Sequence, residues 1–314
     1  MISSKLEYKR PDNIEEAIQF YIQFQDEAVD LSGGTDLVPR LKLGLQRPKA
    51  VIDLKSIESL NTVEDQGDWV RIGGLMRLFD LKQNELIRDL FPALAASLDA
   101  TSCETLQMRG TIAGNLLQDC RCLFYNQSEF WRRSKGLCLK MGGEKCNAVP
   151  GAKTCFANYC SDNAISLFSL SAQVELVGVD GPRRIPLEQL YTNKSRKPFN
   201  IKPGEILASI FIPKTKTVGH YEKLRVRGAI DYPLLGVAFS AANGTGKLAV
   251  GAIGAKPNAV EIEKPFDEKV DEAANGIRKH VKAVNNTVLD ADYRKRMIPV
   301  LAKRVVNKVM EGAK

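Results

Sequence analysis

The cysteines are the most constraining feature of this chain, because six of the seven lie between residues 110 and 162. That segment begins as a glycine-rich turn, "GTIAGNLL", and ends on "YCSD". Its middle part, residues 121–158, is poor in aliphatic side chains and rich in Gly, Lys and Arg, so it cannot bury enough apolar surface to order itself. An odd number of cysteines argues against a disulfide framework and favours metal ligands or buried thiols.

Length and composition indicate a protein with a large core and two or three domains, since the chain has 314 residues, of which 44% are hydrophobic and 26% charged. No apolar run is long enough to span a bilayer. The first residues, "MISSKLEYKRPDN", lack the apolar core of a signal peptide. We therefore expect a cytoplasmic location and no membrane partner.

The net charge of +8 is densest in the C-terminal "YRKRMIPVLAKRVVNKV". Apolar residues recur there at helical spacing (Met297, Ile298, Val300, Leu301, Val305 and Val309). The pattern predicts an amphipathic helix with a solvated basic face, and a docking surface for an acidic partner is the alternative. Because no aromatic-basic RNA motif or zinc-finger spacing occurs, we expect no nucleic-acid partner. Two histidines are too few for a His-rich metal site.

The order of elements predicts an α+β protein in which residues 1–56 and 57–213 form two subdomains and residues 214–314 a separate domain. "NIEEAIQFYIQF" reads as a helix capped by Asn13, and "AVIDL" as a buried strand. "AQVELVGV" and "ILASIFIP" read as strands that end the second region. "YEKLRVRGAIDYPLLGVAFSAA" and "GKLAVGAIGA" predict an antiparallel sheet, followed by helices near 268–284 and 290–311.

Two glycine-rich stretches, "DLSGGTDLVPRL" and "RGTIAGNLL", could hold phosphate through consecutive backbone N–H groups. Neither is a Walker A sequence or a Rossmann fingerprint, and each alone also fits an ordinary turn. Both are followed by apolar residues, and they lie about 75 residues apart. Together they predict one long dinucleotide that bridges the two loops.

Five stretches in this order carry a family resemblance: "GGTDLVPRLK", "IGGLMRLFDL", "RGTIAGNLL…SD", "KLRVRGAIDYPLLGVAFS" and "ADYRKRMIPVLAKRVV". Together they resemble the FAD-binding medium subunit of the molybdenum hydroxylases, the xanthine dehydrogenase and carbon monoxide dehydrogenase family. The resemblance covers essentially the whole chain. It implies the two-subdomain FAD-binding fold of the p-cresol methylhydroxylase type, followed by an α+β C-terminal domain.

The resemblance also implies which residues contact FAD. Two pyrophosphate loops match Asp30, Leu31, Ser32, Gly33, Gly34, Thr35, Asp36 and Leu37, and Thr111, Ile112, Ala113, Gly114 and Asn115. Thr101 matches a further contact, and Asp162 an aspartate near the ribitol or ribose. Leu207 matches a residue near the isoalloxazine ring, and Lys223 a lysine near the flavin. The alternatives are a plain core residue for Leu207 and a surface salt bridge for Lys223.

Asn115 and Asp162 lie 47 positions apart, much further than in the family, which marks residues 121–158 as an insert. The insert holds Cys122, Cys138, Cys146 and Cys155, the number of thiolates that a [4Fe–4S] cluster or a structural zinc needs. We expect a cluster whose charge is offset by nearby cations (Arg132, Arg133, Lys135, Lys140 and Lys145). Zinc, or a flexible loop with incidental thiols, remains possible from spacing alone.

Two cysteines outside this set enter the same prediction. Cys120 and Cys160 fall on the ordinary loop skeleton of the family pattern, and Cys120 is the strongest substitute for Cys122 as a ligand. Cys103 is expected to pack in the core.

Within the family, a flavin subunit with such an insert resembles those of the 4-hydroxybenzoyl-CoA reductase group. That resemblance implies a large partner subunit with molybdopterin cytosine dinucleotide, a small one with two [2Fe–2S] clusters, and a dimer of heterotrimers. It also implies a ferredoxin-like electron donor, with no catalytic residue for the substrate in this chain. The alternatives are a subunit that passes electrons outward to NAD or a quinone, and a non-redox module that binds zinc.

Overall fold

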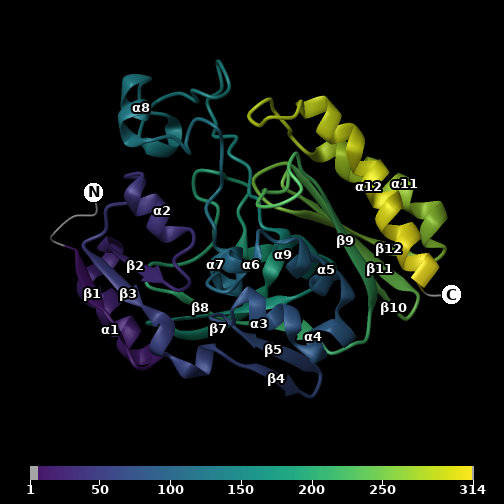
Figure 1. Cartoon of the computed structure of the whole chain (residues 1–314), viewed down its shortest axis with the longest axis horizontal. Coiled ribbons are helices and arrows are strands. Elements are labelled where there is room, and N and C mark those ends of the chain that lie inside the picture. Colours follow the sequence, from purple (N-terminus) through teal and green to yellow (C-terminus); the bar gives the residue numbers. More distant parts are fainter. Residues whose placement is uncertain (1–5, 313–314) are drawn as a thin grey trace.

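The computed structural model describes residues 6–312, which form three sheets with helices between and around them (Figure 1). The first sheet is parallel, in the order β1-β3-β2, and consists of β1 (Glu7–Lys9), β2 (Ala28–Leu31) and β3 (Ala50–Asp53). Helix α1 (Ile14–Phe24) crosses between β1 and β2, and the Asn13 side chain accepts a 2.8 Å hydrogen bond from the N–H of Glu16 at its start. Helix α2 (Leu37–Lys42) follows β2.

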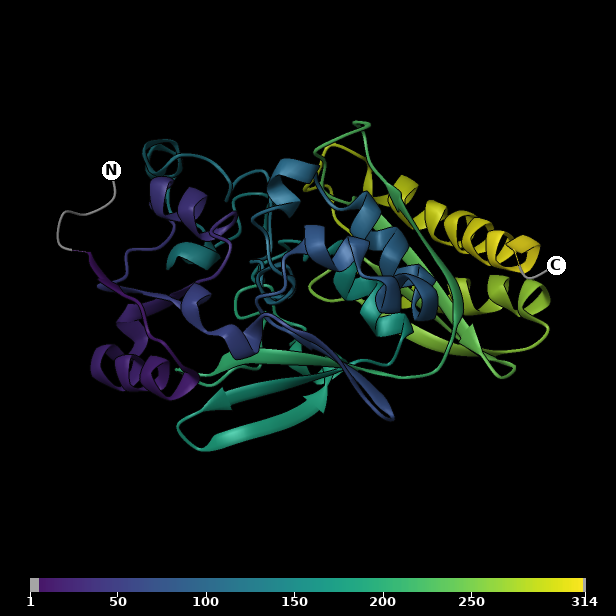
Figure 2. The same cartoon turned by 60° about the horizontal axis from the view of Figure 1, so that its bottom comes forward.

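The second sheet is antiparallel and lies below the central helices (Figure 2). Its order is β4-β5-β8-β6-β7, with β4 (Val63–Gln66), β5 (Trp69–Gly73), β6 (Gln173–Gly178), β7 (Gly181–Pro186) and β8 (Ile206–Pro213). Strand β8 is apolar on both faces because it lies at the centre, where Ile210 pairs with Ile72 and with Val174. Strand β6 buries every second residue, as its alternating sequence predicts.

Short helices fill the space between the second and third sheets (Figure 1). They are α3 (Leu78–Gln83), α4 (Glu85–Leu90), α5 (Pro92–Ala100), α6 (Glu104–Gln107), α7 (Ile112–Leu116), α9 (Asp162–Ser169) and α10 (Leu187–Leu190). Every residue of α9 is buried, because it lies between α5 and the strands of the third sheet. The largest hydrophobic cluster therefore runs without a break from the second sheet through these helices into the third.

The third sheet has the order β12-β11-β10-β9 and is antiparallel throughout. Its strands are β9 (Val218–Leu224), β10 (Leu235–Ala242), β11 (Thr245–Gly251) and β12 (Asn258–Glu263). Helices α11 (Phe266–His280) and α12 (Ala291–Gly312) cover its outer face, in yellow-green and yellow in Figure 1. They bury a second cluster against it.

The predicted α+β class is confirmed, and the strands and helices named from the sequence form close to their expected positions. Two details differ. Val300 is 41% exposed, and the buried stripe of α12 uses Ala302 and Val306 instead. Cys103 is not in the core: it lies partly exposed just before α6, with its thiol 3.3 Å from the hydroxyl of Thr105.

Between α7 and α9 the chain leaves the core as the segment that contains α8 (Glu129–Ser134), at the top of Figure 1. Among residues 6–312, no helix combines the length and the apolar composition needed to cross a membrane.

Candidate cofactor-binding site

The two glycine-rich loops lie against each other at the ends of the first and second sheets. A Cβ on Gly33 would lie 2.0 Å from the backbone oxygen of Arg109, so only glycine permits this approach. The hydroxyl of Thr111 donates to that of Ser32 at 3.1 Å, and a Cβ on Gly114 would lie 3.1 Å from the same Ser32 oxygen. The predicted pairing of the two loops is therefore present in the fold.

The first loop presents free backbone donors. Among residues 6–312, no backbone or side-chain acceptor receives a hydrogen bond from the N–H groups of residues 32–36. Gly34, at φ +74°, turns the chain there. A run of free N–H groups in a tight turn is a binding surface for an anion such as a diphosphate. The second loop differs, since Ile112, Ala113 and Gly114 donate to Met76, Gly74 and Thr111.

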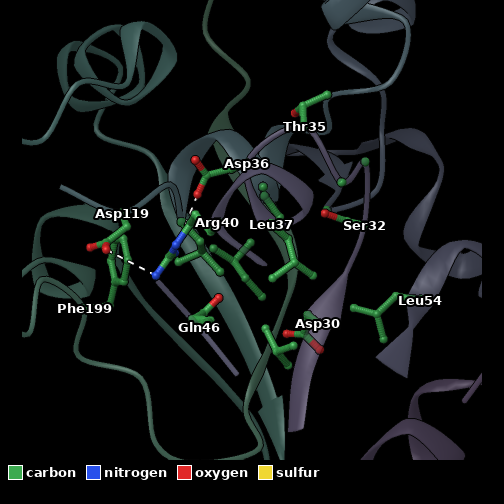
Figure 3. A pocket seen from close by; sticks show the side chains of 18 of the residues that line it. Asp30, Ser32, Thr35, Asp36, Leu37, Arg40, Gln46, Leu54, Asp119 and Phe199 are labelled. Atoms are coloured by element: carbon green, nitrogen blue, oxygen red, sulfur yellow. Dashed lines mark ion pairs between the residues drawn. The ribbon is translucent and has the colours of Figure 1, made fainter. Parts of the chain in front are cut away.

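A first cavity opens beside these loops toward the first sheet (Figure 3). Its walls combine apolar side chains (Leu37, Leu54, Leu60, Leu75, Leu117, Ile206 and Leu207) with charged ones (Asp30, Asp36, Arg40, Asp119, Lys140 and Arg196). At one side, Arg40 pairs with Asp36 at 3.6 Å and with Asp119 at 3.2 Å, as the dashed lines of Figure 3 show. The amide oxygen of Gln46, which also lines the cavity, is buried without a hydrogen-bond partner among the described residues.

Asp30, at the end of β2, faces this first cavity. The hydroxyl of Tyr21 donates to its carboxylate. Burial raises the pKa of Asp30 from 3.8 to about 7, because the charged carboxylate is poorly solvated there. Near neutral pH, Asp30 can thus either accept or donate a hydrogen bond to a ligand.

A second cavity lies on the other side of the same loops, and Thr35, Asp36 and Gly114 line both cavities. Its wall includes Thr101, Thr111, Asn115, Arg121, Cys160, Asp162 and Tyr232. Gln107 also lines it, is only 2% exposed, and leaves its amide oxygen without a partner among the described residues. Two cavities that meet at a pyrophosphate-type loop suit a ligand with a group at each end of a diphosphate.

Asp162 and Lys223 form a buried ion pair behind the second cavity. Their N–O distance is 3.0 Å, and the Tyr221 hydroxyl donates to Asp162 at 2.7 Å. Burial raises the pKa of Asp162, and the Lys223 ammonium opposes that shift. Lys223 also donates to the carbonyl of Asp231 at 3.0 Å. The expected alternative for Lys223, a surface salt bridge, is wrong, because its side chain is only 3% exposed.

The predicted FAD contacts divide between the two cavities. Asp30, Leu37, Ala113 and Leu207 line the first, and Thr101, Thr111, Asn115 and Asp162 line the second. Leu31 and Ile112 line neither, and Lys223 acts only through Asp162 and Asp231. Leu207 thus lies at the first cavity, whereas Lys223 contacts Asp162 at the wall of the second.

The segment 121–158 is closed at its base by two backbone hydrogen bonds between Arg121 and Asn158, of 2.7 and 2.8 Å. The fully buried guanidinium of Arg132 ties the segment to the loop after α2, donating to the carbonyl of Leu43 at 2.8 Å. Its own hydrophobic cluster is small, with only Phe124, Tyr125 and Cys138 buried.

Four thiols of this segment line one small cavity: Cys122, Cys138, Cys146 and Cys155. Of residues 6–312, Lys140 is the only cation on its wall, so the other four expected cations do not line it. The Lys140 side chain is 6% exposed and pairs with Asp119 at 2.5 Å. The N–H of Tyr125 donates to the sulfur of Cys122 at 3.1 Å. Tyr125 and Lys140 also line the first cavity, so the two cavities share a wall.

Cys120 and Cys160 do not line the cysteine cavity. Cys120 packs into the main core, and burial raises the pKa of its thiol. Burial likewise raises the pKa of Cys122 to about 11. It also raises the pKa of Cys155, where the Lys140 charge opposes the shift. Metal ligation favours the thiolates, so it would offset this cost. Among residues 6–312, no three Cys, His, Asp or Glu side chains could hold a single metal ion.

Several residues of this site were not predicted from the sequence. Arg40 follows Asp36 by one helical turn, a spacing that could have indicated the ion pair. Gln46 and Gln107 carry no local signal, because their roles depend on contacts with distant segments. Lys140 was expected near the cysteines, but its place on the wall of the first cavity was not.

The chain is similar in sequence to FAD-binding subunits of known enzymes. The family model described as "FAD binding domain in molybdopterin dehydrogenase" matches residues 4–215. The aldehyde oxidoreductase FAD-binding subunit PaoB of Escherichia coli (strain K12) is 29% identical over 297 residues, which cover 90% of this chain and 91% of that protein. The carbon monoxide dehydrogenase medium chain of Afipia carboxidovorans is 24% identical over 332 residues, covering 100% of both.

A solved structure has the same fold over almost the whole chain. The structure of carbon monoxide dehydrogenase from Hydrogenophaga pseudoflava aligns with a TM-score of 0.77 at 22% identity, covering 99% of this chain and 99% of the matched chain.

Proposed function

The chain belongs to the family of FAD-binding domains of molybdopterin dehydrogenases, and from that premise we propose that it is the flavin and [4Fe–4S] electron-transfer subunit of an enzyme of the 4-hydroxybenzoyl-CoA reductase type. FAD would lie across the two cavities with its diphosphate on residues 32–36. The cluster would lie in the segment 121–158, in the cavity of the four cysteines.

The residues fit FAD in three respects. Gly33 and Gly114 let the two loops lie against each other, so that one ligand can contact both. The N–H groups of the first loop are free, and each cavity holds one buried amide oxygen, on Gln46 and on Gln107, without a partner among the described residues. Buried polar atoms are rarely left unpaired, so these two support a ligand with donors at both ends.

The convergence of four cysteines on one cavity is the observation that carries the cluster proposal. A zinc ion binds its ligands at about 2.3 Å and so draws four sulfurs close together. In a cubane cluster each thiolate binds a different iron atom, so the sulfurs surround a larger group. No three Cys, His, Asp or Glu side chains within residues 6–312 could hold one ion, so a zinc site would require the sulfurs to move closer together. The shared cavity of the four thiols supports the cluster proposal. It also favours Cys122 over Cys120.

When bound, the cluster supplies a one-electron centre and FAD a centre for one or two electrons. The proposed route runs from a low-potential donor such as a ferredoxin through the cluster and FAD to the [2Fe–2S] pair and molybdenum of partner subunits. There, two electrons and two protons would convert 4-hydroxybenzoyl-CoA to benzoyl-CoA and water. The names of the relatives, a "subunit" and a "medium chain", support an assembly with other chains.

A second candidate is the flavin subunit of a molybdenum hydroxylase that passes electrons outward to NAD or a quinone. The relatives named for aldehyde oxidation and carbon monoxide dehydrogenation favour it.

The test is a turnover assay of the purified complex under anaerobic conditions. Our proposal predicts reduction of 4-hydroxybenzoyl-CoA by reduced ferredoxin and no reduction of NAD by aldehydes or purines. The opposite pattern would favour the second candidate.

A further inference from the structure

A wide groove adjoins both the cysteine cavity and, through Arg196, the first cavity. Leu139, Cys155 and Phe156 line both the cysteine cavity and the groove. The rest of the groove comes from the loop at residues 193–196, the loop at 253–258 and the C-terminal end of α11. A molecule in this groove would therefore lie directly against one of the four cysteines.

The groove is strongly basic. Five lysine or arginine side chains line it, and a histidine joins them, with no Asp or Glu on the wall (Lys153, Lys194, Arg196, Lys256, Lys282 and His280). Within the described part of the chain, no carboxylate lies within 4.0 Å of any of the five cations, unlike Lys140 or Lys247, which pair with Asp119 and Glu188. Like charges lining one concave surface focus a positive potential there.

The basic face of α12 is the other candidate that the sequence offered for an acidic partner. It is less suited, because Lys303 pairs with Asp271 at 3.3 Å and Lys308 with Glu222 at 2.5 Å. The helix also lies on the outer face of the third sheet (Figure 1), and no residue of α12 lines the cysteine cavity.

We propose that this groove docks an acidic one-electron carrier protein and brings its redox centre next to Cys155. This inference rests on the proposed function and specifies where its electrons enter. In each encounter the reduced carrier loses one electron and the cluster gains one, with no bond made or broken. Two encounters supply the electron pair that FAD can hold. The spread of the cations over four segments suits an extended acidic surface better than a small anion.

The test uses the complex purified anaerobically, with Lys256→Glu and Lys282→Glu combined in one variant. Both positions lie outside the segment 121–158, so the cysteine cavity stays intact. The matched control combines Lys216→Glu and Arg304→Glu, which make the same charge change at exposed positions away from the groove. Calorimetry measures binding of an oxidised acidic bacterial ferredoxin over a range of salt concentrations, without turnover. Stopped-flow absorbance measures reduction by the reduced ferredoxin and by dithionite.

We expect the groove variant to bind ferredoxin about tenfold or more weakly, with a shallower salt dependence and slower reduction by ferredoxin. Reduction by dithionite should be unchanged, and the control should stay within about twofold of wild type. Equal losses in both variants, or none in either, would overturn the docking site. Loss of partner subunits from the groove variant in mass photometry would overturn it too, since the groove would then be a subunit interface. A complex with about four iron per FAD, the content of the two [2Fe–2S] clusters alone, instead of about eight would contradict the proposed function itself.

Discussion

The proposed FAD cleft, formed by the two cavities beside the glycine-rich loops, shares a wall with the segment 121–158 at Tyr125 and Lys140, but the two regions are held in different ways. The cleft lies where two sheets end, with loops that touch at Gly33 and a buried ion pair behind them. The segment has one six-residue helix, a few hydrogen bonds to the rest of the chain and a small apolar cluster.

This difference indicates that the fold itself forms the FAD cleft, whereas the cysteine cavity depends on its ligand. Burial that raises the pKa of Cys122 and Cys155 works against thiolates in the metal-free protein. Metal binding supplies the missing free energy, as in small metal-dependent domains. The predictions below separate the two regions, beginning with the largest expected effect.

Removal of iron with ferricyanide and EDTA should release the segment 121–158 without unfolding the cleft. In hydrogen–deuterium exchange, the protection factors of this segment should fall by about a hundredfold or more, because opening the segment no longer requires the metal to dissociate. Residues 28–37 and 110–115 should exchange as before. Unchanged protection of the segment would mean that it folds without metal, and the contrast between the regions would fail.

Lys223→Met should destabilise the whole fold. Removing one partner of a buried pair leaves Asp162 charged and uncompensated, at a cost of about 3–5 kcal/mol in the free energy of unfolding. Lys308→Met is the matched control, because its pair with Glu222 is half exposed and contributes about 0–1 kcal/mol. Chemical denaturation measures both. Similar losses for the two variants would show that burial of the Asp162–Lys223 pair does not increase its contribution to the free energy of unfolding.

Gly33→Ala should weaken FAD binding and leave the iron content unchanged. The added Cβ would clash with the backbone oxygen of Arg109 at 2.0 Å, so the loops must separate, at a cost of about 1–3 kcal/mol or roughly 10–100-fold in affinity. The control is Gly276→Ala in α11, where a Cβ meets nothing within 4 Å. Fluorescence titration of the flavin-depleted protein measures the affinity. Wild-type affinity in Gly33→Ala would mean that loop contact is unimportant for FAD.

Asp30→Asn should change only the pH dependence of stability. With its pKa raised from 3.8 to about 7, wild-type Asp30 holds a proton in the folded state that the unfolded state has lost, so wild-type stability falls as pH rises from about 4 to 7 and then levels off. The free energy of unfolding of the variant should therefore rise relative to that of wild type by at most about 1.4 kcal/mol per pH unit up to pH 7, and the difference should stay constant above pH 7. Urea denaturation from pH 5 to 8.5 measures this. A flat difference would contradict the raised pKa of Asp30.

Much of the fold could be predicted from the sequence, because its signals are local. Strand β8 is apolar except for Ser209, and α1 has a capping residue, so the local pattern indicates both. The fully buried α9 is different: "DNAISLFS" has four polar residues that find partners only in the fold, such as Asn163 with Asn115. Sequence periodicity cannot show that such a helix is buried.

The candidate site shows the same division. The glycines at 33 and 114 and the number of cysteines in the segment are visible as residue types. Asp162 and Lys223 form their buried pair although they lie 61 positions apart in the sequence. Lys140, which lies between two cavities, pairs with Asp119, 21 positions away. Such pairs depend on tertiary packing, which no local pattern encodes.

The central claim is that this chain holds two independent redox sites, a FAD cleft and a cluster in the segment 121–158. The most direct measurement is the iron, acid-labile sulfide and flavin content of the chain purified anaerobically, as wild type and as Cys138→Ser, with Cys103→Ser as the control outside the cavity. We predict about four iron and four sulfide per FAD in wild type and in the control, and loss of iron with FAD retained in Cys138→Ser. FAD without iron in the wild type would contradict the cluster, and loss of FAD together with iron in Cys138→Ser would contradict the independence of the two sites.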